Sequence, residues 1–145
     1  MDHTDFQILN LLQADSRTNY KEIGSHVGLT APAVSRRICI MKDQGIIRKF
    51  SVSFNRKKLS YETVGFLRIA VKPAEYSKFC VFCDKEQKII SHFHLVGKYN
   101  ALIRFAVHNS QESEQLLADV EKYGQREMFL ELETYFENKE FFHET

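Results

Sequence analysis

Two adjacent arginines, Arg36 and Arg37, lie in the stretch GLTAPAVSRRICIMKDQGII, which runs from Gly28 to Ile47. A guanidinium group is permanently charged and presents a planar fork of donors, so it can bind a phosphate or pair bidentately with O6 and N7 of guanine. Ala31, Ala33 and Ser35 are small enough to permit close approach to a groove. The stretch is therefore either a helix that contacts DNA or an ordinary amphipathic helix with two solvated arginines.

A second group of residues has the spacing of metal ligands. Cys80 and Cys83 form a CxxC motif, and His92 and His94 could complete a zinc site. Both cysteines, however, fall on the apolar stripe of a predicted helix, so we expect buried thiols and no metal. No Ser/His/Asp set, P-loop or dinucleotide fingerprint is present, and we expect neither catalytic residues nor a cofactor.

The elements that must position the arginines have the pattern of a helix-turn-helix. An apolar-periodic helix follows Asp2, and a second short helix runs from Tyr20 to about Val27. Gly28 can end it through a positive φ, and Thr30 can cap a third helix that has Pro32 in its first turn and continues to about Gln44. Two short helices joined by a tight glycine turn predict a helix-turn-helix between Lys21 and Ile40.

The third helix presents its two arginines in different directions. At about 100° per residue, Val34, Ile38 and Met41 share the buried side, and Arg36 lies opposite them. Pro32 lies on the same side as Arg36. Arg37 lies at the edge of the buried stripe, where it can reach a phosphate or pair with an acid of a neighbouring helix.

The charge of the chain is divided unequally. Residues 1–60 carry 10 Lys and Arg against 5 Asp and Glu, whereas residues 61–145 carry 10 against 14, so the net charges are +5 and −4. Only the first part is suited to a polyanion. The alternation of residues 47–54 predicts a wing or linker strand, and we expect one domain over residues 1–60 and another over 61–145.

The second half predicts a ferredoxin-like βαββαβ sandwich, which makes the fold class α+β. One face of its sheet is expected to pack against the helices. The side chains of the opposite face are too mixed for a core and too apolar for simple exposure to solvent. We therefore expect a subunit interface on the opposite face, with an open solvated face as the alternative. If His92 and His94 lie in that interface, the dimer should weaken toward pH 5 to 6. The expected core face carries Leu67, Ile69, Val71, Phe93, Leu95, Ile103, Phe105, Val107, Leu130 and Leu132, and the expected interface carries Phe66, Arg68, His92, His94, Leu102, Arg104, Glu131, Glu133 and Tyr135.

The motifs D-x-x-D-x-x-I-L-x-x-L-x-x-D-x-R from Asp2 to Arg17, KEIGSHVGLT, and V-x-x-R-I ahead of GII resemble the Lrp/AsnC (feast/famine) family of prokaryotic transcriptional regulators. The resemblance covers essentially the full chain. It implies an N-terminal winged helix-turn-helix and a C-terminal αβ-sandwich domain of RAM type, which binds small effectors, usually amino acids, and mediates dimers and higher assemblies such as octamers.

The resemblance also implies functional residues. DNA contacts fall on Thr30, Ala31, Ser35, Arg36 and Arg37, with Pro32 beside them, and the family's G-x-x-D turn appears as Gly97, Lys98, Tyr99 and Asn100, which would contact an effector. The chain departs from the family pattern at Ile40, where many members have a second arginine, at Lys42, where glutamate is common, and at Asn100, which offers no charge to a ligand ammonium.

These observations predict a sequence-specific DNA-binding transcriptional regulator that acts as a homo-oligomer and responds to an amino-acid-like effector. The alternative is an amino-acid-binding module whose helix-turn-helix serves protein contacts. The apolar runs are too short to span a bilayer, and the first residues lack the pattern of a signal peptide, so we expect no membrane partner and a cytoplasmic location.

Overall fold

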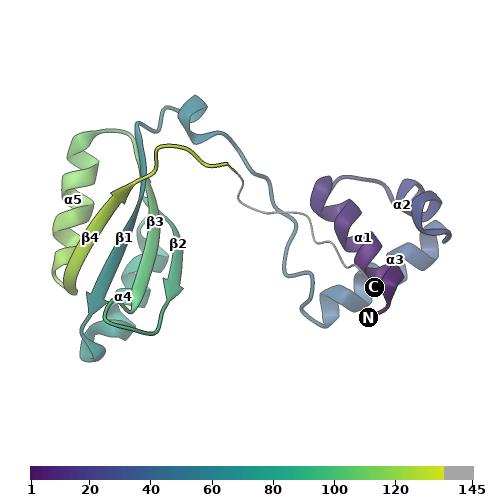
Figure 1. Ribbon diagram of the computed structural model, residues 1–145, viewed down its shortest axis with the longest axis horizontal. Coiled ribbons are helices and arrows are strands. Elements are labelled where there is room, and N and C mark those ends of the chain that lie inside the picture. Colours follow the sequence, from purple (N-terminus) through teal and green to yellow (C-terminus); the bar gives the residue numbers. More distant parts are fainter. Residues whose placement is uncertain (136–145) are drawn as a thin grey trace. The chain divides into compact units, whose positions relative to one another are not determined.

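The computed structural model describes residues 1–135, which form two compact units, Met1–Ser53 and Phe54–Tyr135. The first unit is helical, and the second combines helices with a β-sheet (Figure 1). The predicted α+β class, with helices first and a βαββαβ sandwich after them, is confirmed. Within residues 1–135, no helix is long and apolar enough to cross a membrane.

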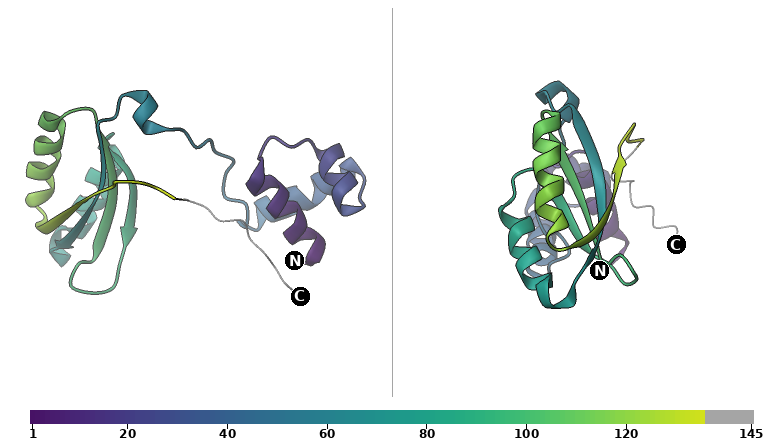
Figure 2. Two further views of the ribbon diagram at one scale, coloured as in Figure 1. Left: turned by 45° about the horizontal axis from the view of Figure 1, so that its top comes forward. Right: turned by 90° about the vertical axis from the view of Figure 1, so that its left-hand side faces the viewer.

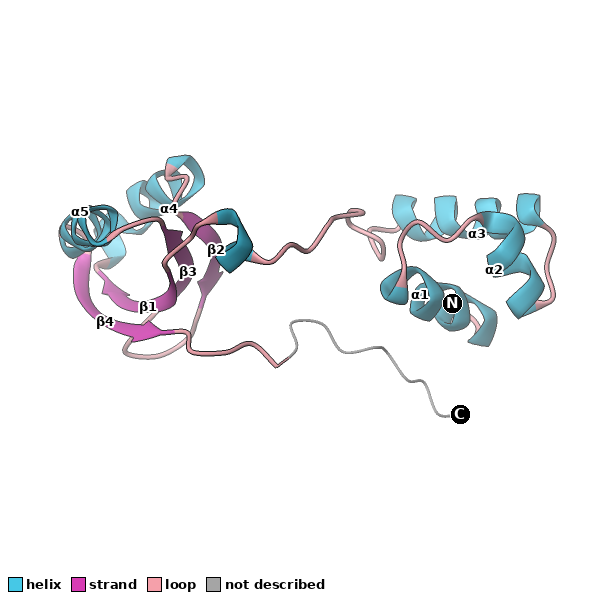
Figure 3. Cartoon of the chain, turned by 90° about the horizontal axis from the view of Figure 1, so that it is seen from above, coloured by secondary structure: helices cyan, strands magenta, loops and turns pink. Residues whose placement is uncertain are grey.

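Three short helices make up the first unit: α1 (His3–Ala14), α2 (Tyr20–Val27) and α3 (Ala31–Asp43) (Figure 3). Asp2 and Asp5 form a capping box at the start of α1, and the side chain of Asn19 accepts the backbone N–H of Glu22 at the start of α2. These bonds satisfy amide groups that the first helical turn leaves free. Side chains from all three helices meet in one core: Ile8, Leu12, Ile23, Val34, Ile38 and Met41.

The segment that follows the helices differs from its prediction. Residues 47–54 were expected to form a strand, and the structure forms none there. A strand needs a neighbour to take its backbone hydrogen bonds, and none of the strands within residues 1–135 pairs with this segment. Phe50, Val52 and Phe54 are exposed, and the next element is the short 3-10 helix η1 (Arg56–Leu59).

The second unit is one antiparallel sheet covered on one face by two helices, as the right-hand view of Figure 2 shows. The strands are ordered β2-β3-β1-β4, so the first and third strands are central. In chain order the elements are β1 (Thr63–Val71), the 3-10 helix η2 (Pro73–Glu75), α4 (Tyr76–Lys85), β2 (Ile89–His94), β3 (Ala101–Val107), α5 (Ser110–Glu121) and β4 (Gly124–Leu130).

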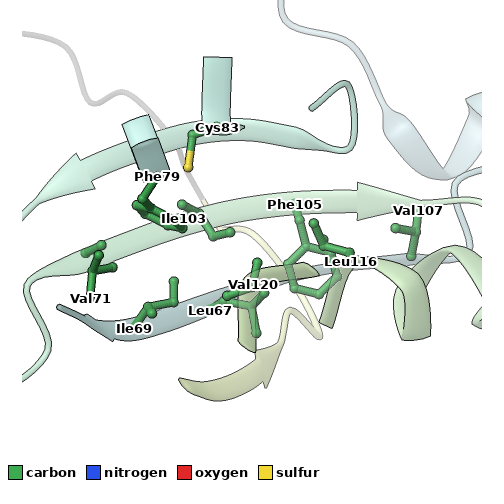
Figure 4. Packing of buried hydrophobic residues seen from close by; sticks show 11 residues of the cluster. Leu67, Ile69, Val71, Phe79, Cys83, Ile103, Phe105, Val107, Leu116 and Val120 are labelled. Carbon is green, nitrogen blue, oxygen red and sulfur yellow. The ribbon is translucent and has the colours of Figure 1, made fainter. Parts of the chain in front are cut away.

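The core of the second unit lies between the central strands and the two helices (Figure 4). Phe79 and Cys83 of α4 and Leu116 and Val120 of α5 pack onto it. Alternation along the central strands is the physical basis, because every second side chain of a strand points to the same face. The predicted core positions on those strands are buried: Leu67, Ile69, Val71, Ile103, Phe105 and Val107.

An irregularity near the start of β2 overturns part of the predicted assignment of sheet faces. The pairing of β2 with β3 shifts between Ile89 and Ser91. One extra residue reverses the side on which every later side chain points. His92 therefore lies opposite Ile103 on the helix-covered face, while Phe93 is half-exposed on the other face. The prediction was wrong for three positions of this strand: His92, Phe93 and His94.

The last strand, β4, ends before the last residues that the sequence predicts on the two faces of the sheet, which reach Tyr135. Leu130 is its final residue and is exposed, and residues 131–135 form no strand. Leu132 is 86% exposed. The prediction that Leu130 and Leu132 belong to the core was therefore wrong. Leu95, just past the end of β2, is exposed as well. Glu133 and Tyr135, which were expected in the interface, lie beyond the sheet.

Candidate nucleic-acid interface and effector loop

Helix α3 has a buried side and an outward side that agree with its helical period. Val34, Ile38 and Met41 are almost inaccessible to solvent because they pack on the other two helices. Arg36 is exposed on the opposite side, as the sequence predicts. The first turn of the helix, which precedes Arg36, contains no acidic residue. The exposed residues on this outward side are Pro32, Arg36, Cys39, Ile40 and Asp43.

The turn between α2 and α3 fixes the start of α3. Gly28 adopts the left-handed conformation with φ of 70°, and the N–H of Leu29 donates to the carbonyl of Gly24 at 2.9 Å. A Cβ at Gly24 would lie 2.3 Å from the carbonyl oxygen of Leu29, so the turn closes only on a residue without a side chain. Thr30 occupies the N-cap position of α3 without a side-chain capping bond. In addition, the first turn of α3 contains no acidic residue, so the positive end of the helix dipole favours an approaching anion.

Arg37 binds α1 in this structure. Its Nη1 atom lies 2.7 Å from Asp2 Oδ2 and 2.7 Å from Asp5 Oδ1. The hydrogen bond from Arg37 lowers the pKa of Asp2, and the bonds to Asp5 and Asp2 raise the pKa of Arg37. The pair of carboxylates therefore ties α3 to the first turn of α1, which is the second of the two roles that the helical period leaves open for Arg37.

A groove of about 410 Å³ runs beside the outward side of α3, within the first unit. Its polar lining comes from the two arginines, Asp5 and Gln44, and its apolar lining comes from Met1, from the turn and from α3 itself. The apolar residues are Met1, Leu29, Ala33, Ile40 and Met41.

The loop between β2 and β3 contains the predicted effector residues, and Asn100 holds it in place. The Asn100 side chain accepts the N–H of Val71 at 2.8 Å and donates to the carbonyl of the same residue at 3.0 Å. Tyr76 of α4 also donates its hydroxyl to the carbonyl of Asn100 at 3.2 Å. Gly97 has a φ of 136°, which a residue with a side chain rarely adopts. Asn100 is thus engaged by the backbone of β1 rather than free for a ligand.

The side chain of Tyr99 contacts a charged cluster on the sheet, which consists of Arg68 of β1 and Glu127 of β4. Its hydroxyl donates to Glu127, which also pairs with Arg68. The Arg68 guanidinium lies 4.4 Å from the centre of the Tyr99 ring and 5.2 Å from that of Phe129, at cation–π distance. The Tyr99 hydroxyl, followed by Arg68, lowers the pKa of Glu127, and the bond to Glu127 raises the pKa of Tyr99.

The sheet face away from the helices mixes ion pairs with exposed aromatic rings. Arg104 and Glu131 form a pair at 3.0 Å and are each only about one-sixth exposed. Phe93 and Phe129 are half-exposed on this face. Five of the predicted interface residues lie here: Phe66, Arg68, Leu102, Arg104 and Glu131.

The first 42 residues, from α1 through most of α3, match the AsnC-type helix-turn-helix domain. The sequence is also 30% identical over 132 residues to the HTH-type transcriptional regulator LrpB of Bacillus subtilis, which covers 91% of this chain and 89% of that protein. The chain belongs to the Lrp/AsnC family. Another relative, the HTH-type transcriptional regulator PF2053 of Pyrococcus furiosus, is 37% identical over 74% of this chain and 72% of its own length. As a member of the Lrp/AsnC family, the protein is a transcriptional regulator with an N-terminal helix-turn-helix.

Solved structures of Lrp/AsnC proteins have the same fold. Escherichia coli AsnC aligns with a TM-score of 0.83 and 21% identity over 96% of this chain and 97% of that one. A transcriptional regulator from Neisseria meningitidis, solved in complex with L-Met, aligns with a TM-score of 0.87 and 19% identity over 97% and 96%. At these identities the likeness establishes the architecture of the two domains and not the residues that bind ligands.

The cysteines and histidines of this Lrp/AsnC chain that have the spacing of zinc ligands do not form a metal site in the described residues. Cys83 is buried in the core, and burial raises the pKa of its thiol to about 12, so it is neither a thiolate nor a ready metal ligand at neutral pH. Cys80 is exposed on the same helix, so the prediction of a buried thiol was wrong for this cysteine. In the part of the chain that the structure describes, no group of three or more His, Cys, Asp or Glu residues could hold a metal ion.

His92 belongs to an aromatic cluster under α4 instead of the expected interface. Its ring meets Phe79 edge-on at 5.2 Å, and its Nε2 atom lies 3.5 Å from the hydroxyl of Tyr76. The centre of the His94 ring lies 4.3 Å from that of Tyr76, and the two rings are tilted by 31°. Burial first, and the charge of His94 second, lower the pKa of His92 below its ordinary value of 6.5.

Acidification is therefore expected to destabilise the second unit through His92. Because the unfolded chain binds the proton at a higher pH than the folded chain, the free energy of unfolding should fall as the pH drops below about 6.5 and level off once folded His92 titrates. Thermal unfolding followed from about pH 7.5 to about pH 5 should show this slope in the wild type and lose it in His92→Gln. His26→Gln, which replaces an exposed histidine of α2, serves as the control and should keep the slope; an unchanged slope in His92→Gln would assign it to other groups.

Three residues that bind predicted site residues are not identified from the sequence, although a local signal marks two of them. Asp2 and Asp5 receive Arg37, and only their spacing at a helix start marks them, because i, i+3 acids at an N-terminus indicate a capping box. Glu127 meets Tyr99 across 28 residues of chain, which no local pattern indicates.

Proposed function

We propose that this Lrp/AsnC-type regulator reads double-stranded DNA with the N-terminal half of α3. The observation that carries the proposal is Arg36, which stands exposed on the outward side of a helix whose first turn holds no acid. Guanidinium in a major groove can pair with guanine, and the free helix N-terminus favours a phosphate. The net charge of +5 over residues 1–60 supports the same partner.

In this proposal, Arg36 and Arg37 of α3 have different roles. Arg36 contacts a base edge, whereas Arg37 orients α3 through Asp2 and Asp5 and reaches a phosphate only at the expense of that pairing. The remaining residues of the contact surface are small or polar and lie at the start of the helix, where backbone can approach DNA closely: Thr30, Ala31, Pro32 and Ser35.

We propose further that the β2–β3 loop receives a small amino acid. The groups that would contact the ligand are the backbone amide of Gly97, the ammonium group of Lys98 and the ring of Tyr99. Asn100 holds the loop through its bonds to Val71 and does not contact the ligand in this proposal. The Neisseria meningitidis relative was solved with L-Met, which supports an amino acid as the ligand class. Glu127 supplies, next to Tyr99, the negative charge that Asn100 lacks.

The protein in this proposal acts as a homodimer or a multiple of dimers such as an octamer. The open sheet face supports pairing of two copies, because half-exposed Phe93 and Phe129 flank ion pairs that are themselves partly shielded. Two-fold pairing predicts two half-sites in a pseudo-palindrome, spaced by roughly 10 bp or a multiple of it. We assign no catalytic residue or cofactor, and the role implies a cytoplasmic location.

Selection of duplexes from random DNA, followed by gel shift, tests this proposal. We expect one preferred pseudo-palindromic operator, which also occurs in DNA upstream of the protein's own gene, and an affinity that falls steeply with salt. The same assay with a panel of amino acids should shift the affinity for one class. An amino acid that binds a protein with no DNA preference would instead support the alternative, in which the helix-turn-helix serves protein contacts.

A further inference from the structure

Besides Asp43, the last residue of the helix, the exposed outward side of α3 carries one charged residue, Arg36. Ile40 lies one helical turn further along and is 45% exposed, and Cys39 beside it is exposed as well. An aliphatic side chain at this place can bind neither a phosphate nor the polar edge of a base. It can contact an apolar group that DNA presents in the major groove.

The groove beside α3 has the composition that such a contact needs. Its apolar lining includes Leu29, Ala33 and Ile40, and its polar lining consists of Asp5, Arg36, Arg37 and Gln44. An apolar surface next to guanidinium groups suits a nucleotide that combines a methyl group with a neighbouring phosphate. Among the four bases, only thymine presents a methyl group in the major groove.

We infer that Ile40 reads the C5-methyl group of a thymine, beside the base that Arg36 contacts. The inference rests on the proposed function, in which α3 enters the major groove. One helical turn advances about 5.4 Å along α3, and base pairs are stacked about 3.4 Å apart. The thymine therefore lies within about two base pairs of the Arg36 contact.

The contact has a distinctive energetic signature. It depends on burial of a methyl group and not on charge, so its contribution varies with sequence and is insensitive to salt. Burial of one methyl group corresponds to about a fourfold change in affinity. An ordinary exposed isoleucine would make no difference that depends on the DNA sequence.

Replacement of single thymines by uracil tests the inference, because uracil differs from thymine only by the missing methyl group. The selected operator is synthesised with uracil at one thymine at a time, and fluorescence anisotropy gives the dissociation constant for full-length protein. At one position per half-site, the wild type should lose about fourfold in affinity. Ile40→Ala should bind the thymine and uracil operators equally at that position.

A matched variant separates this effect from a general loss of apolar surface. Ile46 has a similar exposure of 39% and lies outside α3, so Ile46→Ala should retain the uracil sensitivity of the wild type. Ile40 is not part of the core, and circular dichroism should show that Ile40→Ala is folded. Ile40→Ser, which has no methyl group, serves as a second variant with the same expected result.

The outcomes distinguish the inference from the function on which it rests. A wild type that does not prefer its operator over scrambled DNA would overturn both. A clear preference with every uracil tolerated, or with the same uracil sensitivity in wild type and in both Ile40 variants, would overturn the reading of thymine alone and leave the proposed DNA-binding function intact.

Discussion

Arg36→Ala is expected to weaken operator binding about 10- to 100-fold and to relax the base preference at one position of each half-site. A bidentate arginine–guanine pair contributes about 1–3 kcal/mol of discrimination, and an alanine leaves the base edge without a donor. The exposed position of Arg36, without an acid in the first turn of α3, is the structural basis. Fluorescence anisotropy with the operator and with single-base variants measures both effects.

Arg17→Ala is the matched control for charge, because it removes the same positive charge from an exposed site outside α3. It should lower affinity slightly and equally for all sequences, and it should leave the base preference intact. If Arg36→Ala lowers the affinities for operator and scrambled DNA by the same factor, Arg36 contacts a phosphate and does not read a base.

Phe79→Ala is expected to destabilise the second unit by about 3–5 kcal/mol, because a fully buried aromatic side chain is lost and the surrounding core cannot close the cavity. Phe79 is inaccessible to solvent and contacts the rings of Phe82, His92 and Tyr123. Urea unfolding gives the size of the loss. Hydrogen exchange, followed by mass spectrometry, locates it on peptides from β1 and β3.

Val81→Ala tests whether the loss comes from the cavity rather than from the helix. Val81 lies on the same helix and is 53% exposed, so its replacement should change stability by no more than about 0.5 kcal/mol. Peptides from α1, α2 and α3 should keep their exchange rates in both variants, because the first unit has its own core. Equal losses in the two units would contradict separate cores.

Local patterns in the sequence predict the helices and the central strands because the physics that forms them is local. Asn19, Gly28 and the spacing of Val34, Ile38 and Met41 suffice to place α2, the turn and α3. The same spacing puts Arg36 on the outward side. Alternation suffices for β1 and β3, since both are buried on one face by helices.

Edge strands and side-chain partners depend on contacts that sequence patterns do not contain. In IISHFH, apolar residues occur at both parities, so the irregularity before Ser91, which turns His92 toward α4, has no local signal. The pairing of Arg37 with Asp2 joins residues 35 positions apart. The strand expected over residues 47–54 requires a neighbour, and no strand in the described part of the chain pairs with it.

The bonds between Asn100 and Val71 have a thermodynamic consequence for any ligand of the β2–β3 loop. They fix the loop to the end of β1 before a ligand arrives, and the bond from Tyr76 adds a third anchor on α4. A free amino acid has few atoms, so its binding energy could not offset the entropy lost in ordering a mobile loop. An anchored loop lowers that cost, so the amino acid that we propose as its ligand would bind more tightly than it would to a mobile loop.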